Sequence, residues 1–513
     1  MIFLSGIIFL IFKSIRSISN NGVIFMKYFY TYEVDSRFWL YDRYSNTINE
    51  VDFLTCKIFE TYDKHKFDEK IVLSVLESFA NPSKIKKALQ EIKFYQEEKE
   101  MFVCKNIDKC VMPISEQELL YKYNNEISHV IFNITDNCNM RCKYCKFGET
   151  YQDSRNHNNK SMSLEVIDNG LKLIDKYYKN TKTLIIAFYG GEPLIEFNKI
   201  KLIVNRIKAK YNNVRFSFTT NGVLLNNKII DFLIKNNFII KVSLDGSKEK
   251  HDSNRVLINN KGTFDIIKQK LDIIKEKDVD YFNKNMGFIL TLAPPYNLME
   301  IVDFFEQNTN INQPILINYV DVFDTTYFKN FNMKNEVENL KEQQKILLAE
   351  YIKYKINNIK NKRAKILEEF FSKPLNLLDE RLIFPLKYKE VSPNGACYPG
   401  IDRLFINTDG KLGMCEKVNE NLPLGDVFQG INIDKVKKIY NNYCDIINKV
   451  CLDCWAYRLC GSCYNGSIKG GLLSVERKKE DCTIKMKSIK KNLILYTKIK
   501  MYNDDAFKSY NLT

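Results

Sequence analysis

The sequence lacks a long apolar run, which argues against a transmembrane helix of ordinary length. Its opening segment, residues 2–12, is apolar over only eleven residues, whereas a helix that spans a bilayer needs about 20. Lys13 and Arg16 follow this segment and do not precede it, so it does not match a secretory signal. We expect residues 1–25 to be an upstream extension of the reading frame without a function, and we expect no stable membrane insertion.

The sequence also lacks the marks of a nucleic-acid-binding protein, of a repeat protein and of a disordered chain. Its formal net charge is +15, from 77 Lys and Arg against 62 Asp and Glu, but no block of like charge is interleaved with stacking aromatic residues. No fixed period recurs, and large apolar side chains occur throughout. We therefore expect a globular protein without a nucleic-acid partner, whose basic surface is solvated or faces an acidic peptide.

Fourteen cysteines are present, and their spacings are short and clustered. Such spacing favours metal ligation by thiolates in a reducing compartment over disulfide bonds. The cysteines therefore predict a cytoplasmic protein.

The first part of the chain has the pattern of a small mixed domain. Residues 27–51 alternate like three short strands, with turns at Asp35-Ser36 and Ser45-Asn46. Residues 54–62, 68–79 and 83–99 have apolar side chains at helical spacing. We expect a winged-helix-like domain over residues 26–110.

Strands alternate with helices over the next two hundred residues, which predicts an α/β fold with a parallel sheet. We expect six strands, at residues 127–135, 183–189, 214–220, 238–245, 286–293 and 314–320. This domain would cover residues 120–330, followed by a helical connection over 331–392 that breaks at Lys373-Pro374. Gly, Cys and short turns then predict a small metal-held fold over 393–485, with a C-terminal helix or tail over 486–513.

A tight group of cysteines follows the first of these strands. Cys138, Cys142 and Cys145 have CxxxCxxC spacing, so three thiolates leave one iron of a four-iron cluster open. Zinc, the alternative, usually takes two close pairs of ligands. The spacing, together with Tyr144, resembles the signature of the radical SAM superfamily. The resemblance implies a partial six-stranded β/α barrel, S-adenosylmethionine (SAM) on the open iron, a 5′-deoxyadenosyl radical and a flavodoxin- or ferredoxin-like reductant.

Further motifs end the next three strands, and the ends of parallel strands meet at one face. They are Gly190, Gly191, Glu192 and Pro193, then Thr220 and Asn221, then Ser243 and Asp245. The glycines permit a close approach of the backbone to a ligand, and Glu192 offers an acceptor for an ammonium group. The superfamily resemblance implies that residues 190–193 contact the methionine amine and that Ser243 and Asp245 lie near the ribose.

The C-terminal cysteines resemble the SPASM domain, although the last close pair is one residue nearer than the family spacing. They are Cys397, Cys415, Cys451, Cys454, Cys460, Cys463 and Cys482. The resemblance implies two auxiliary 4Fe-4S clusters, and so three clusters in all. Cys451, Cys454, Cys460 and Cys482 would hold one, and Cys397, Cys415 and Cys463 the other. Either Cys444 completes the second set, or its open iron is available to a substrate thiolate.

Two residues are candidates for catalytic roles. Glu416 directly follows Cys415 and could accept a proton when a radical is oxidised, or it could be a solvated turn residue. Arg255 could contact SAM or substrate, or it could form a surface ion pair.

The order of the three domains suggests a peptide substrate. The N-terminal pattern resembles the recognition element of enzymes that modify ribosomally made peptides, where a leader adds a strand to a sheet edge. The whole order resembles the ranthipeptide and sactipeptide maturases, and this resemblance implies thioether cross-linking of a Cys-rich precursor peptide. The alternatives are a formylglycine-forming sulfatase-maturating enzyme, a C–C bond-forming maturase, a zinc-ribbon nucleic-acid-binding protein and a scaffold with an inactive radical site.

Overall fold

The computed structural model describes residues 27–64, 68–151, 156–308, 314–358, 363–418 and 420–508. The predicted extension over residues 1–25 lies outside these ranges. Within them, every helix is too short or too polar to cross a bilayer.

An antiparallel sheet opens the described chain, and its strands and helices confirm the expected order. Strands β1 (Phe29–Val34), β2 (Arg37–Asp42) and β3 (Thr47–Val51) pair in that sequence. Both turns are where the sequence placed them, since Asp35, Ser36 and Asn46 have positive φ angles. Helices α1 (Phe53–Lys64), α2 (Glu69–Leu76) and α3 (Pro82–Glu98) follow.

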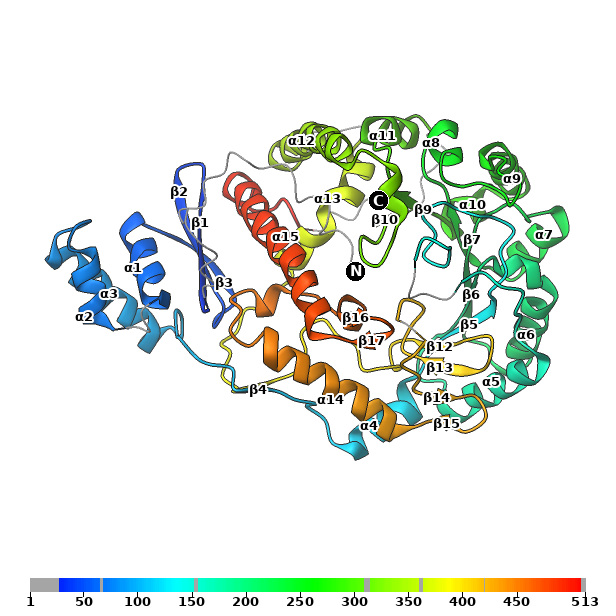
Figure 1. The fold of residues 1–513 in the computed structure, drawn as a ribbon, viewed down its shortest axis with the longest axis horizontal. Helices are drawn as coiled ribbons and strands as arrows, with labels where there is room; N and C mark the ends of the chain where they lie inside the picture. Colours follow the sequence, from blue (N-terminus) through cyan, green and yellow to red (C-terminus); the bar gives the residue numbers. More distant parts are fainter. Residues whose placement is uncertain are drawn as a thin grey trace.

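Both faces of this small sheet are covered. Phe29 and Leu40 pack into a core with the three helices, while alternate residues on the other face join the main core of the molecule. On that second face Tyr30 stacks on Trp455 at 4.3 Å between ring centroids, and the Tyr32 hydroxyl lies 2.8 Å from Thr497 Oγ1. The sheet is therefore fixed against the long C-terminal helix α15 (Val475–Tyr502), as Figure 1 shows.

The six predicted parallel strands are all present. In the sheet they lie in the order β10-β9-β8-β7-β6-β5, each parallel to its neighbour. Their bounds are β5 His129–Thr135, β6 Leu184–Gly190, β7 Val214–Thr220, β8 Ile239–Ser243, β9 Met286–Leu292 and β10 Ile315–Tyr319. The chain thus has an α/β fold with a large, mostly parallel sheet.

Helices between the strands cover the outer face of this sheet (Figure 1). They are amphipathic, and α5 for example buries Val166, Ile167 and Leu173 while its lysines face outward. Their bounds are α5 Leu164–Tyr177, α6 Phe197–Lys210, α7 Asn227–Lys235, α8 Lys248–Asp252, α9 Phe264–Lys277, α10 Val279–Asn285 and α11 Leu298–Gln307.

The Cys-rich region continues the same sheet. Strand β12 (Leu404–Ile406) pairs in parallel with β5, and β13 (Lys411–Gly413), β14 (Gly425–Asp426) and β15 (Gly430–Ile431) extend the sheet antiparallel. The sequence indicated a separate small fold from residue 393, but strands on both sides of that boundary belong to one sheet. Three buried residues are too few to show a strand by periodicity.

The helical connection breaks earlier than expected. Helix α12 (Met333–Asn357) ends at Asn358, which has a left-handed conformation, and α13 (Ala364–Asp379) runs through Pro374. The predicted break at Lys373-Pro374 is therefore wrong. Proline removes one backbone hydrogen bond, but the buried residues on either side, Phe371 and Leu375, hold the helix in place.

The remaining elements join these parts. They are β4 Lys109–Cys110, α4 Glu116–Glu126, η2 Pro193–Glu196, η3 Tyr327–Asn330, β11 Glu390–Val391, α14 Ile433–Val450, η4 Tyr457–Leu459, η5 Tyr464–Ser467, β16 Ile468–Lys469 and β17 Leu472–Leu473. Helix α15 begins before residue 486 and contains Cys482.

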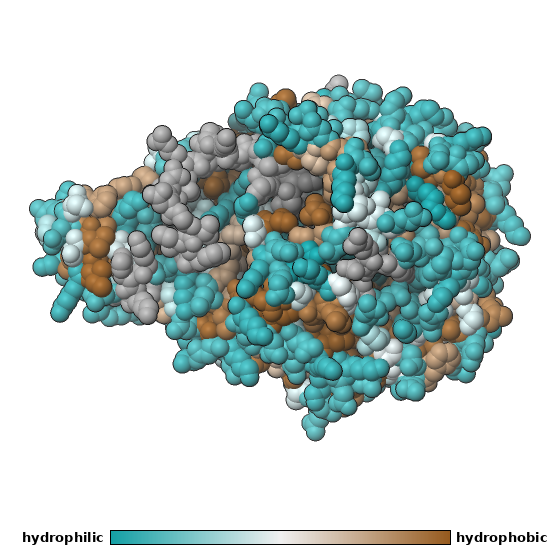
Figure 2. Space-filling model, viewed as in Figure 1, coloured by the Kyte–Doolittle hydropathy of each residue, from teal (hydrophilic) through white to brown (hydrophobic). Residues whose placement is uncertain are grey.

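The surface seen in Figure 2 is mostly hydrophilic, with an apolar group at the end formed by α2 and α3. The large apolar and aromatic residues that these two helices and the α2–α3 turn expose are Ile71, Val75, Phe79, Phe94 and Tyr95.

Candidate functional site

The loop that carries Cys138, Cys142 and Cys145 leaves the carboxyl end of β5 and is held by hydrogen bonds within the loop and to Val256. The Cys145 N–H donates to the Cys142 carbonyl at 3.0 Å. The Arg141 guanidinium donates to the Cys138 carbonyl at 2.8 Å, and its backbone N–H donates to Val256 O at 2.8 Å. The three thiols are thereby presented from one short segment.

The surroundings of these thiols fit an iron–sulfur cluster. Burial raises the pKa of the Cys138 and Cys142 thiols to about 12, so their thiolates need the positive charge of a metal to form at neutral pH. Donors also point at the sulfur atoms, because the Met140 N–H lies 3.5 Å and the Asn221 amide nitrogen 3.9 Å from Cys138 Sγ. Cys145 Sγ lies 3.5 Å from His157 Nε2.

The two glycines at the end of β6 make room for the cysteine loop. A Cβ on Gly190 would lie 2.2 Å from the Thr135 carbonyl oxygen, and one on Gly191 would lie 2.2 Å from the Asn137 carbonyl oxygen. Gly190 also has φ +153, which favours glycine. The close approach that the sequence indicated is therefore to the protein's own backbone, and Gly191 N–H donates to Thr135 O at 2.9 Å.

Glu192 lies two residues after β6 and is held between two strand ends. Its side chain is fully buried, and its carboxylate accepts hydrogen bonds from Leu194 N, Thr220 Oγ1 and Asn221 N at 3.1, 2.8 and 2.7 Å. Burial has the larger effect on the pKa of Glu192 and raises it to about 7, although these hydrogen bonds lower it. The carboxylate thus braces the ends of β6 and β7, and its role as an acceptor for an ammonium group stays a prediction. Pro193 is buried at the start of η2.

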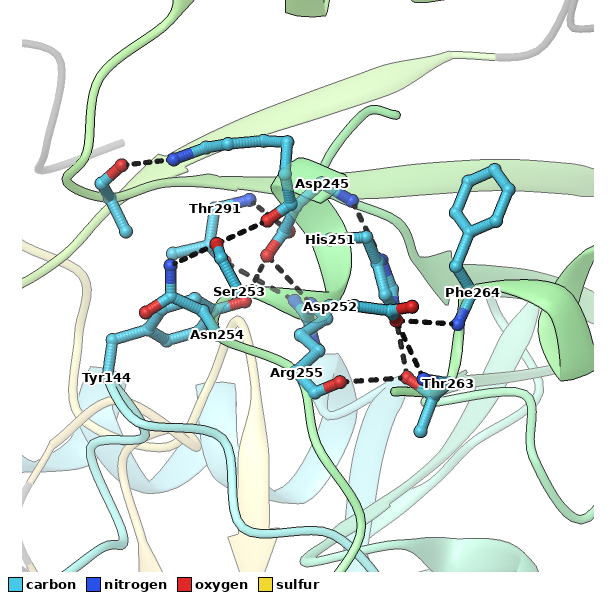
Figure 3. A network of polar contacts seen from close by, with 12 residues as sticks. Tyr144, Asp245, His251, Asp252, Ser253, Asn254, Arg255, Thr263, Phe264 and Thr291 are labelled. Atoms are coloured by element: carbon cyan, nitrogen blue, oxygen red, sulfur yellow. Dashed lines mark hydrogen bonds and ion pairs between the residues drawn. The ribbon is translucent and has the colours of Figure 1, made fainter. Parts of the chain in front are cut away.

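The end of β8 carries a buried ion pair. Asp245 Oδ2 accepts from Arg255 Nε at 3.0 Å and from the Tyr144 hydroxyl, while Oδ1 accepts from Thr291 N at 2.9 Å (Figure 3). The Arg255 and Asp245 side chains are only 8% and 1% exposed. Arg255 is therefore not in a surface ion pair, one of the two roles considered, but links the cysteine loop to β8 and β9. Ser243, the last residue of β8, is also buried.

A second layer fixes the segment after β8. His251 Nδ1 accepts from the Asp245 N–H at 3.3 Å, and Nε2 lies 3.0 Å from Thr263 Oγ1 (Figure 3). Burial lowers the pKa of His251 to about 4, so the ring is neutral. Asp252 Oδ1 accepts from Thr263 N and Phe264 N at 2.7 and 2.9 Å. His251 and Thr263 thereby hold the backbone of Asp245 and Arg255 in position.

Comparison with known proteins shows which family the segment with these strand ends resembles. The family model described as the radical SAM superfamily matches residues 132–307, which span the cysteine loop and the motifs that follow it. This segment is thus a radical SAM domain, a member of the radical SAM superfamily of enzymes. Membership implies a 4Fe-4S cluster and SAM, and Cys138, Cys142 and Cys145 are the residues that would hold the cluster.

Curated relatives match this radical SAM protein over part of their length. The cysteine-type anaerobic sulfatase-maturating enzyme of Clostridium novyi (strain NT) is 35% identical over 188 residues, which cover 35% of this chain and 48% of the relative. The radical SAM cyclopropyl synthase TigE of Paramaledivibacter caminithermalis is 31% identical over 197 residues, covering 34% and 41%. The matched part of this chain thus spans less than half the length of either relative.

The fold also matches a solved structure. Native anSMEcpe with bound AdoMet and the Cp18Cys peptide superposes with a TM-score of 0.51 at 18% identity, over 72% of this chain and 99% of that chain. At this identity the likeness concerns the fold alone.

Several C-terminal cysteines of the radical SAM protein lie close enough to interact electrostatically. Electrostatic interactions link Cys454 with Cys460 and Cys482, and Cys482 with Cys451. Cys397, Cys415 and Cys463 interact with one another in the same way. That these cysteines ligate two auxiliary clusters stays a prediction.

Cys444 does not join the second group. It is buried in α14, and its thiol interacts electrostatically with that of Cys110 in β4. Of the two alternatives for the fourth position, completion by Cys444 therefore lacks support.

Glu416 is largely enclosed and is not a solvated turn residue. Its Oε1 accepts from Arg403 Nη1 at 2.8 Å, while its Oε2 is buried without a hydrogen-bond partner. His129 of β5 and Lys241 of β8 interact electrostatically with both Glu416 and Arg403. The sequence analysis missed these three basic residues, although residues at every second strand position face the same side of a sheet.

A single metal ion would be bound by a group of side chains that lie close together. Among the residues that the structure describes, no group of three or more His, Cys, Asp or Glu side chains is placed to hold one ion. This finding concerns single-ion sites such as the zinc alternative, since a four-iron cluster distributes its ligands over separate irons.

Proposed function

We propose that this radical SAM enzyme modifies a ribosomally synthesised, Cys-rich precursor peptide and forms thioether cross-links in it. The observation that carries the proposal is the largely enclosed Glu416, directly after Cys415, which with Cys397 and Cys463 forms the predicted incomplete ligand set. Glu416 interacts with His129 and Lys241 of the barrel strands. An auxiliary cluster with an accessible iron would thus adjoin the barrel that generates the radical.

The bound cluster and SAM would supply a 5′-deoxyadenosyl radical, which takes a hydrogen atom from the peptide. The protein's own residues hold and orient the partners. Asp245 and Arg255 fix the cysteine loop to the strand ends, and Arg403 orients Glu416 through Oε1. The buried Oε2 of Glu416 is the candidate acceptor for the proton that the peptide releases on oxidation.

The N-terminal sheet supports a peptide substrate. Strand β3 pairs with β2 on one side only, within the described chain, and a leader could add a strand at this edge. Electrons would come from a flavodoxin- or ferredoxin-like reductant. The three proposed clusters correspond to about twelve irons per chain, and such a protein would function in a reducing, cytoplasmic compartment.

The test is anaerobic reconstitution with iron and sulfide, followed by reaction with a candidate Cys-rich peptide and mass spectrometry. Each thioether should remove two hydrogens and one free thiol from the peptide. Cys142→Ala should abolish release of 5′-deoxyadenosine, whereas Cys56→Ala, in helix α1, should not. An unchanged count of peptide thiols would exclude thioether formation.

A second candidate is formylglycine formation on a sulfatase, which the identity with the Clostridium novyi enzyme favours. The fate of sulfur separates the two reactions, because a thioether keeps the cysteine sulfur and formylglycine formation removes it. Incubation with a sulfatase-derived cysteine peptide should leave it unchanged if the first proposal is correct.

A further inference from the structure

The first and last cysteines of the CxxxCxxC loop each have a polar group beside the sulfur, but the two groups differ in origin. The donors near Cys138 come from the loop backbone and from Asn221, at the end of β7. The group near Cys145 is the imidazole of His157, whose Nε2 lies 3.5 Å from Cys145 Sγ. His157 follows Cys145 by twelve residues, so the CxxxCxxC motif does not include it.

Backbone hydrogen bonds hold the segment that carries His157. The His157 N–H donates to the Phe147 carbonyl at 3.0 Å. Three residues further on, the Lys160 carbonyl accepts from the Asp136 N–H and from the Thr135 hydroxyl, both at 2.9 Å. The half-buried imidazole is therefore fixed between the cysteine loop and the end of β5.

Chemistry decides which atom donates in this contact once iron is bound. A thiolate ligand has no proton and can only accept a hydrogen bond. A proton on Nε2 is therefore attracted to Cys145 Sγ, whereas a lone pair on Nε2 would be repelled by it. Both the neutral ring with its proton on Nε2 and the imidazolium can donate, so the contact does not depend on the titration of His157.

A hydrogen bond to a cluster sulfur changes the reduction potential of the cluster. Reduction adds one negative charge to the iron and sulfur atoms. A donor aimed at a sulfur consequently stabilises the reduced form more than the oxidised form. The expected effect of the His157 N–H is a higher potential, which makes the cluster easier to reduce.

We propose that His157 is a positioning residue that acts through Cys145 and raises the reduction potential of the cluster held by Cys138, Cys142 and Cys145. The inference rests on the cluster that superfamily membership implies, and it is independent of the thioether reaction and of the auxiliary clusters. The potential at which this chain accepts its electron then depends on a residue that the motif does not specify.

The test is a redox titration of the full chain, reconstituted anaerobically with iron and sulfide and followed by electron paramagnetic resonance without SAM or peptide. The relevant signal is the one that Cys142→Ala lacks. In His157→Phe the ratio of reduced to oxidised cluster at a fixed potential should fall about tenfold, or about 59 mV for a one-electron couple, because a hydrogen bond to a charged group is lost. His157→Gln, whose amide can donate, should recover most of this shift. Asn159→Ala, an exposed and neutral neighbour, should keep the parent potential.

A second measurement uses the unaltered protein and so does not depend on how the variants fold. With ¹⁵N-labelled histidine, pulsed electron paramagnetic resonance of the reduced cluster should show a weak nitrogen coupling that His157→Gln abolishes. Absence of this coupling, or equal potentials in the parent and His157→Phe, would overturn the inference. So would a strong coupling, as from a histidine bound to iron, because His157 would then be a ligand. Peptide takes no part in either measurement, so a thioether that never forms refutes the proposed function alone.

Discussion

Replacing Asp245 by Asn should strongly destabilise the strand-end rim. The change would leave the Arg255 guanidinium, whose side chain is 8% exposed, without its anionic partner. Removing one partner of a buried ion pair costs about 3–5 kcal/mol. With roughly 2–4 °C of melting temperature per kcal/mol for a unit of this size, the expected loss is about 6–20 °C.

A double variant measures the interaction between Asp245 and Arg255 apart from their contacts with other residues. Asp245→Leu combined with Arg255→Met replaces both charges by apolar groups, and such replacements are often close to neutral. The double variant should therefore melt well above either single variant, giving a coupling free energy of about 2 kcal/mol or more. The assay is thermal unfolding of anaerobically loaded protein by circular dichroism, with Lys277→Met as a control for loss of an exposed ion pair. Additive losses in the double variant would refute a buried, mutually dependent pair.

Three more outcomes follow from the site. Burial lowers the pKa of His251 to about 4, so as pH falls below about 6.5 the unfolded chain binds a proton that the folded chain does not, and up to about 3 kcal/mol of stability is lost by pH 4. In urea unfolding, the stability of His251→Gln should lack this pH dependence, and equal slopes of stability against pH in the two proteins would contradict it. Gly191→Ala places a Cβ 2.2 Å from Asn137 O and should remove about a third of the bound iron, unlike Gly461→Ala, whose Cβ meets no atom within 4 Å. Glu416→Gln keeps the bond to Arg403 and should slow peptide oxidation by roughly 10²–10⁴-fold while 5′-deoxyadenosine release continues; an unchanged product rate would exclude Glu416 as the base.

The sequence predicted elements whose signal is local. The six parallel strands are short segments rich in apolar side chains and bounded by turns or helices, and the motifs at their ends follow from the geometry of parallel sheets. Strand β12 was missed because three residues have no measurable period, and its pairing with β5 joins segments more than two hundred residues apart. The helix break predicted at Pro374 was wrong because tertiary packing of α13 outweighs the local cost of proline.

Roles within the site were harder to predict than positions. Gly190, Gly191 and Glu192 lie at the rim as expected, but their contacts are with the cysteine loop and with β7. A sequence shows that glycine is needed for a close approach but not which partner approaches. The same holds for Arg255, since the burial that excludes a surface ion pair arises only from assembled tertiary structure.

The parallel ladder between β12 and β5 makes the two halves of the molecule inseparable. A chain cut before residue 393 would lose β12 and present β5, the strand that leads into Cys138, as a bare edge open to pairing with other molecules. Domain exchange among relatives would therefore have to keep residues 404–406 with the barrel. For expression work, the natural unit of this protein runs through the Cys-rich segment and does not stop at the end of β10.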